Sequence, residues 1–152
     1  MASDVEKIKK LRIETGLGIH DIKKALEEAK GDEKKAVELL KKWGLNTVAK
    51  RAGRDANQGI IYTYTHANHR FGSMVEVNCE TDFVARNDGF KQFVHDVALQ
   101  VAAMNPESVE DLLKMEFFKE PSKTIGDLLT ETIQKIGENI KIKRFVRYEL
   151  GE

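Results

Sequence analysis

The sequence lacks most of the features that define secreted, membrane-spanning or metal-binding proteins. Its 152 residues include one cysteine, so no internal disulfide can form and no cysteine cluster can hold zinc. No apolar run is long enough to cross a bilayer, and the N-terminal stretch from Met1 to Lys7 lacks the apolar core of a signal peptide. We therefore expect a protein of a reducing intracellular compartment with no membrane partner.

An excess of charge of either sign is also missing, because 25 basic residues balance 25 acidic ones. Nucleic-acid binding through bulk charge needs a clear basic excess, so we expect no direct nucleic-acid contact. The basic group comprising Lys41, Lys42, Lys50, Arg51 and Arg54 is better interpreted as a solvated linker. What the chain does have is 41% hydrophobic and 33% charged residues, which is typical of a globular domain with a charged surface.

Residues 3–44 have the periodicity of three short amphipathic helices. Ser3 and Glu6 form a capping box at the start of the first helix, and Gly44 is expected to end the third. Helices of this length are marginal alone, so we expect them to pack as a bundle around Leu11, Leu26 and Leu40. The sequence thus predicts a three-helix bundle in residues 1–45, of the ubiquitin-associated type, followed by a polar linker in residues 46–59.

Residues 60–152 predict an α+β domain. Residues 60–66 and 71–79 are expected to form a hairpin, residues 88–104 a helix, and residues 107–123 a short helix and a loop. Thr124 and Asp127 form a second capping box before a helix that ends at Gly137, and the last strand follows. Strands and helices do not alternate strictly, so the class is α+β with a mainly antiparallel three-stranded sheet packed with helices.

Alternation along two strands predicts which side chains are buried. In the second hairpin strand one face carries Phe71, Ser73, Val75, Val77 and Cys79. In the last strand the expected buried face carries Ile140, Ile142, Val146, Tyr148 and Leu150.

Residues with catalytic or ligating chemistry do not form a recognisable constellation. Cys79 lies on the apolar strand face and precedes Glu80, so a buried structural thiol is favoured over the alternative of a nucleophile in a small hydrolase. Glu80 and Asp82 are more often solvated carboxylates than an acid pair. His20, His66, His69 and His95 lack metal-ligand spacing. We predict no catalytic residue, no metal site, no cofactor and no enzyme activity.

The segment Thr81-Asp82-Phe83-Val84, here called the Thr81–Val84 loop, stands between a strand and a helix. Phe83 cannot be buried by local periodicity, so it must fold back onto its own core or enter another molecule. We expect it to enter a partner protein.

The N-terminal bundle has two open interpretations. It can be a peptide-binding module that presents Leu17, Ile19 and Leu45 from its loops, or a purely structural bundle. Periodicity does not separate the two. One hypothesis for the whole chain is therefore a peptide- or ubiquitin-type binding module fused to an unrelated α+β interaction domain.

Several blocks in order along nearly the whole chain resemble the elongation factor Ts family. They are Lys10 to Gly18, Asp21 to Ala29, Gly31-Asp32 with Ala36, Gly59-Ile60-Ile61, Val75 to Ala85 and Lys135 to Ile140. The resemblance implies a guanine-nucleotide exchange factor that binds elongation factor Tu carrying GDP and promotes GDP release, so that GTP can load.

The resemblance also assigns roles to residues. Thr81, Asp82, Phe83 and Val84 would displace the magnesium site of elongation factor Tu. Leu11, Arg12, Thr15, Gly16 and Gly18 match the signature of the bundle that docks on the GTPase. The expected location becomes the cytoplasm of a bacterium or the matrix of an organelle.

The chain resembles a short form of the family. Only residues 107–124 separate two core helices, so most of the helical protrusion and the second half of the core are expected to be missing. A core of this kind, of a dimerisation type, can complete its sheet against a second copy, which makes a homodimer one expectation.

Overall fold

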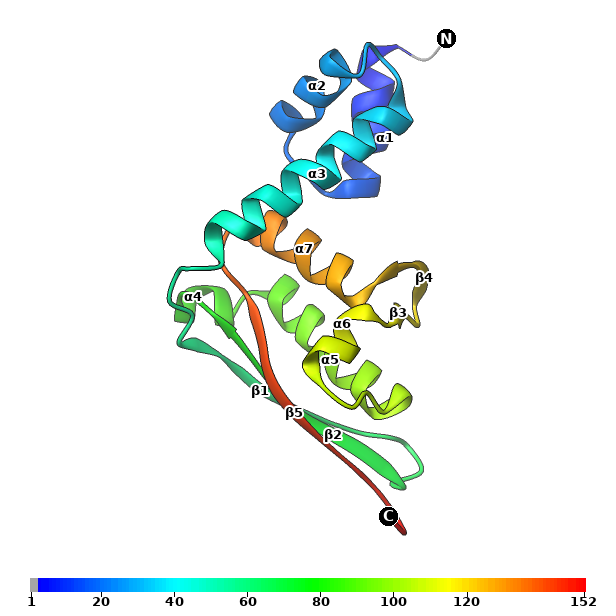
Figure 1. Ribbon diagram of the computed structural model, residues 1–152, viewed down its shortest axis with the longest axis vertical. Helices are drawn as coiled ribbons and strands as arrows, with labels where there is room; N and C mark the ends of the chain where they lie inside the picture. The colour runs from blue at the N-terminus through cyan, green and yellow to red at the C-terminus, as the bar shows by residue number, and fades with distance from the viewer. Residues whose placement is uncertain (1–2) are drawn as a thin grey trace. The chain divides into compact units, whose positions relative to one another are not determined.

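The computed structural model describes residues 3–152 and confirms the α+β class (Figure 1). Met1 and Ala2, at the start of the predicted bundle 1–45, lie outside the described residues. The chain divides into two compact units, one ending at Lys50 and the other covering Arg51–Glu152. Within the described part, no helix is both long and apolar enough to cross a membrane.

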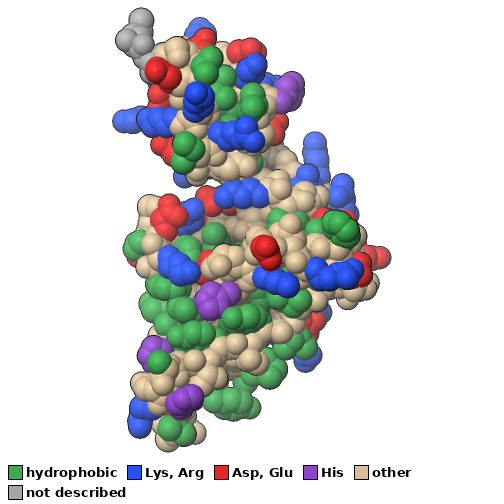
Figure 2. Space-filling view, turned by 180° about the vertical axis from the view of Figure 1, so that it is seen from behind, with side chains coloured by type: hydrophobic (Ala, Val, Ile, Leu, Met, Phe, Trp, Pro, Cys, Tyr) green, Lys and Arg blue, Asp and Glu red, His purple; other side chains and the backbone are tan. Residues whose placement is uncertain are grey.

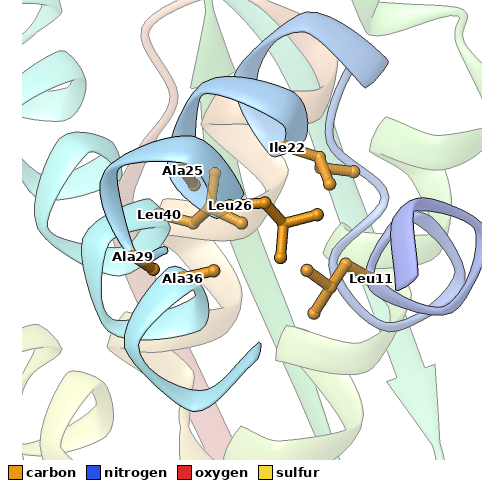
Figure 3. Close-up of a cluster of buried hydrophobic side chains, with 7 residues drawn as sticks. All are labelled: Leu11, Ile22, Ala25, Leu26, Ala29, Ala36 and Leu40. Carbon is orange, nitrogen blue, oxygen red and sulfur yellow. The ribbon is translucent and has the colours of Figure 1, made fainter. Parts of the chain in front are cut away.

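The N-terminal unit is built from helices α1 (Asp4–Thr15), α2 (Ile19–Glu28) and α3 (Glu33–Arg51). The predicted capping box opens α1, with the Ser3 hydroxyl accepting from the backbone of Glu6 and the Glu6 carboxylate accepting from the backbone of Ser3. Apolar side chains of the three helices point toward one another in a single cluster (Figure 3). The cluster consists of Leu11, Ile22, Ala25, Leu26, Ala29, Ala36 and Leu40.

Helix α3 is longer than the sequence predicts, because it continues through Gly44 to Arg51. A glycine inside a helix costs only about 1 kcal/mol relative to alanine, which the surrounding helical hydrogen bonds can outweigh. Gly44 is buried, and the Thr47 hydroxyl donates to the carbonyl of Trp43 within the continuous helix. The prediction that Gly44 ends this helix is therefore wrong. Whether 1–45, 46–59 and 60–152 mark separate domains stays a prediction.

The second unit contains a three-stranded antiparallel sheet in the order β1-β2-β5. Its strands are β1 (Gln58–Thr65), β2 (Phe71–Cys79) and β5 (Lys141–Glu149). Helices α5 (Asp88–Met104), α6 (Val109–Lys114) and α7 (Ile125–Ile136) cover one side of this sheet (Figure 1). The predicted capping box of Thr124 and Asp127 opens α7, and Gly137 closes it with a φ of 86°.

The region between α6 and α7 forms a short hairpin where a loop was predicted. Its strands are β3 (Glu116–Phe117) and β4 (Glu120–Thr124). The side-chain amide of Gln100, on α5, holds the backbone of this hairpin in place. Its nitrogen donates to the carbonyl of Glu116 at 3.0 Å, and its oxygen accepts from the N–H of Phe118 at 3.2 Å. Because Gln100 is 18 residues from Phe118, no local pattern could predict this support.

The predicted burial of β2 is confirmed for Ser73, Val75, Val77 and Cys79, which all face the helices and are buried. The last strand departs from its prediction. The pairing of β2 with β5 shifts between Glu76 and Val77, so that Lys143 is an extra residue in β5. A β-bulge of this kind reverses the alternation beyond it.

Beyond the bulge, the side chains expected to be buried are exposed. Val146 is 40% exposed and Tyr148 is 76% exposed, whereas Ile142, before the bulge, is only 6% exposed. With Ile61 of β1 and Met74 of β2, these two residues form an apolar surface on the side of the sheet away from the helices. We call Ile61, Met74, Val146 and Tyr148 the open sheet face.

Candidate partner-binding site

Most of the Thr81–Val84 loop forms a single helical turn, α4 (Asp82–Ala85), shortly after the end of β2 at Cys79. Thr81 has an extended backbone, and its hydroxyl caps the turn by accepting from the N–H of Val84 at 3.2 Å. This is the N-cap arrangement that threonine favours, because its oxygen satisfies an amide at the start of the turn. The turn itself is a feature that the sequence reasoning did not predict.

Phe83 points into solvent from this turn. Its side chain is 82% exposed, whereas Ala85, two residues later, is 6% exposed and fixes the turn to the unit. Phe83 therefore does not fold back onto the core. Asp82 is also exposed and pairs with Arg86 at 2.9 Å on the same turn.

Glu138 holds the start of the loop from a distant part of the chain. One carboxylate oxygen accepts from the N–H groups of Glu80 at 3.1 Å and Thr81 at 3.0 Å, and the other accepts from the Thr81 hydroxyl at 2.8 Å. Glu138 is a residue of the site that was not predicted from the sequence. The only signal was its place in the Lys135 to Ile140 block.

Glu80 and Asp82 do not converge as an acid pair. The Glu80 carboxylate accepts from the N–H of Asn139 at 2.7 Å and lies 3.5 Å from the guanidinium of Arg54, while Asp82 pairs with Arg86. Each carboxylate is thus paired with a different part of the molecule, which is a structural arrangement rather than a general acid–base one.

Cys79 lies beneath the loop and is fully buried. Its thiol donates to the carbonyl of Thr81 at 3.1 Å. Burial, with a smaller contribution from the negative charge of Glu138, raises the pKa of the Cys79 thiol to about 11. A nucleophilic cysteine needs the opposite shift and an accessible sulfur, so these observations argue against the hydrolase hypothesis.

Two histidines of the second unit, His66 and His95, make aromatic contacts. The Tyr62 hydroxyl lies 2.8 Å from Nδ1 of His95, and His66 stacks on Phe71. Hydrophobic side chains with histidines among them gather over this unit on the side seen in Figure 2. Among residues 3–152, no three His, Cys, Asp or Glu side chains are grouped so that they could hold a metal ion.

The residues matched to the docking signature shape the turn between α1 and α2. The Thr15 hydroxyl donates to the carbonyl of Leu11 at 2.6 Å and accepts from the N–H of Leu17. Gly16 ends α1 with a φ of 67°, a left-handed conformation that glycine adopts without strain. Gly18 stands at the N-cap of α2.

Only part of this signature is accessible to a partner. Leu11 is 1% exposed and belongs to the bundle core, so it can support docking only by holding the turn, whereas Arg12 is exposed. Of the three residues in the peptide-binding interpretation, Ile19 and Leu45 are 44% and 62% exposed, whereas Leu17 is half-buried against the bundle core. Ile13, which the sequence reasoning did not select, is 86% exposed on α1.

Comparison with known proteins gives one consistent result. The family model described as Elongation factor TS matches residues 80–152. A protein named Elongation factor Ts from Carboxydothermus hydrogenoformans is 44% identical over 95% of this chain and 88% of its own length. Proteins of the same name from Thermoanaerobacter sp. and Moorella thermoacetica are 42% and 41% identical over 95% of this chain, and over 93% and 94% of their own.

These matches bear on two expectations from the sequence. The hypothesis of a binding module fused to an unrelated domain is contradicted, because single relatives match 95% of this chain, which includes both the bundle and the α+β region. The alignment with the Carboxydothermus protein runs over 190 positions, whereas this chain has 152 residues. That relative therefore has residues for which this chain has no counterpart, as a short form requires.

Proposed function

The chain belongs to the elongation factor Ts family of translation elongation factors, and from this membership we propose that it is the guanine-nucleotide exchange factor for elongation factor Tu. In this proposal it binds the GTPase carrying GDP, disturbs the magnesium site and lets the nucleotide leave. GTP then loads as this factor departs.

The exposed side chain of Phe83 is the observation that carries the proposal. A phenylalanine 82% exposed on a capped helical turn is a large apolar group held in water. Its full burial in a partner is worth about 1.5–3 kcal/mol, which is comparable to an interface hot spot. Insertion of Phe83 beside the magnesium can therefore compensate for distortion of the site that holds the nucleotide phosphates.

The proposed action needs no covalent chemistry. A factor that binds the empty GTPase more tightly than the loaded one weakens nucleotide binding by the same ratio, because the coupling is reciprocal. It accelerates release and loading alike. The structural roles of Glu80, Asp82 and Cys79 are compatible with this action.

The N-terminal unit is proposed to dock on the nucleotide-binding domain of the GTPase. Arg12 offers an exposed charge on α1, and Thr15, Gly16 and Gly18 fix the turn that follows it. Exposed Ile19, at the start of α2, adds apolar surface beside that turn. With zero net charge on the chain, no direct nucleic-acid contact is part of the proposal.

Stopped-flow release of a fluorescent GDP from elongation factor Tu tests the proposal. The wild-type protein should accelerate release, and Phe83→Ala should reduce the acceleration by about thirtyfold, as expected for a hot spot of about 2 kcal/mol. Phe118→Ala is a matched control, since Phe118 is also exposed but lies between β3 and β4. Absence of acceleration by the wild-type protein would refute the proposed function.

We also propose that the second unit forms a homodimer through the open sheet face. An antiparallel sheet usually presents polar side chains on its uncovered side, whereas here Ile61, Met74, Val146 and Tyr148 are 62%, 47%, 40% and 76% exposed. A second copy would offer a face of identical shape around a two-fold axis. The charges of Glu76 and Arg144 on the same face already pair at 2.8 Å.

A further inference from the structure

Two segments far apart in sequence hold each other at the base of the Thr81–Val84 loop. The carboxylate of Glu138 accepts from the backbone of Glu80 and Thr81, and the carboxylate of Glu80 accepts from the backbone of Asn139. The side-chain amide of Asn139, which is 3% exposed, donates to the carbonyl of Arg54 at 2.8 Å. The segment after α7 is therefore attached both to the start of the Thr81–Val84 loop and to the backbone of Arg54.

The Thr81 hydroxyl transmits this contact to α4. A hydroxyl has one proton, and that of Thr81 is donated to Glu138. Its lone pairs are then turned toward the N–H of Val84, which they accept at 3.2 Å. Glu138 thus sets the direction of the cap that holds the turn carrying Phe83.

The stability of α7, the helix that precedes Glu138, does not explain why a glutamate stands at this position. It follows Gly137, the residue that closes α7, and a negative charge is disfavoured at a helix C-terminus. Three hydrogen bonds from Glu80 and Thr81 oppose this cost. A residue that goes against the local preference of a helix end, as Glu138 does, is expected at a functional site.

We infer that Glu138 is a positioning residue for nucleotide exchange: its carboxylate holds Thr81, and through Thr81 the turn that presents Phe83 to the GTPase. The inference rests on the proposed function. A loop already ordered in the free protein avoids the loss of freedom that ordering on binding entails. Glu138 therefore acts on the step in which Phe83 enters the magnesium site, and not on docking of the N-terminal unit.

Hydrogen exchange of single amides in the free protein tests the holding contact. Glu138→Ala should speed exchange of the Glu80, Thr81 and Val84 amides by about tenfold or more, as expected for losing hydrogen bonds to a charged acceptor. Glu138→Gln should give a smaller effect, because its amide oxygen can still accept from both backbone N–H groups. The matched control is Glu131→Ala, on α7, the helix that precedes Glu138, where the lost partner is Lys123 at 2.8 Å.

Release of fluorescent GDP from elongation factor Tu, measured across a range of factor concentrations, tests the role in exchange. Glu138→Ala should lower the maximal release rate about tenfold while the half-saturating concentration changes less than threefold. In a Phe83→Ala background the same substitution should change the maximal rate less than about twofold, because the side chain that it positions is gone. If Glu138→Ala does not fold, Glu138→Gln carries the same comparison.

The outcomes separate this inference from the proposed function. Amides that exchange equally in Glu138→Ala and Glu131→Ala would overturn the holding contact. Faster amide exchange with a maximal release rate equal to that of Glu131→Ala would overturn the role in nucleotide release while the proposed function stands. A wild-type protein that does not accelerate release would overturn the proposed function, and with it the part assigned to Glu138.

Discussion

Ile142 and Val146, four residues apart on the same strand, face opposite sides of the sheet. Ile142 is 6% exposed and packs on the helix side, whereas Val146 is 40% exposed on the open sheet face. The cause is the extra residue, Lys143, at the point where the pairing of β5 with β2 shifts. This one inserted residue thereby places Val146 and Tyr148 on the open sheet face, the surface proposed for dimerisation.

Tyr148→Glu should convert a dimer into a monomer. Tyr148 is 76% exposed in the single chain, so a charge there costs the monomer little but would be buried without a partner in a dimer. Light scattering after size-exclusion chromatography measures the mass of each form. Val5→Glu, at an exposed position on α1, is the control and should leave the mass unchanged. A wild-type protein with the mass of one chain would contradict the dimer.

Phe83→Ala and Phe90→Ala should separate binding from folding. Phe90 is fully buried, and its truncation should lower the free energy of unfolding by about 3–5 kcal/mol. Phe83 is 82% exposed, so the same truncation should change the free energy of unfolding by less than about 0.5 kcal/mol. Urea denaturation followed by circular dichroism measures both values. Comparable losses in the two variants would show that Phe83 belongs to the core.

Local signals in the sequence were sufficient for much of the fold. The capping boxes at Ser3 and Thr124, the closing glycine at Gly137 and the alternation along β2 each depend on residues a few positions apart. Such patterns are set by the geometry of one helix turn or one strand. They predicted the hairpin, the main helices and the burial of Cys79.

The features that sequence could not reveal depend on contacts between distant residues. The bulge at Lys143 exists only relative to β2, and the β3–β4 hairpin is held by Gln100 of α5. The lack of local periodicity at Phe83 left open whether its side chain packs on its own core or enters a partner, and its exposure is seen only in the structure. The residue that fixes its turn had no local signal either. Glu138 is 57 residues from Thr81, and nothing near Glu138 in sequence indicates that its carboxylate has this partner.

Gly59→Ala should severely destabilise the second unit. Gly59 has a φ of 142°, and a Cβ there would overlap the backbone carbonyl oxygen of Val77. The strained conformation and the clash with backbone together should cost about 3 kcal/mol or more. Gly53→Ala is the control, because a Cβ at Gly53 meets nothing within 4 Å and should change stability by less than about 0.5 kcal/mol. Equal melting temperatures for the two variants would contradict the requirement for glycine at position 59 of β1.

The buried thiol of Cys79 should make stability fall at alkaline pH. Burial raises its pKa from 9.0 to about 11, so the unfolded chain releases this proton first as the pH rises. The stabilising contribution is complete below pH 9 and is lost as the pH rises through the folded value, by about 1–2 kcal/mol between pH 9 and 11. Cys79→Ala lacks this titration, and comparing its urea unfolding with that of wild type across this range cancels the lysines and tyrosines that titrate in both. A wild-type curve parallel to that of Cys79→Ala would show that the thiol ionises as freely in the folded protein as in the unfolded chain.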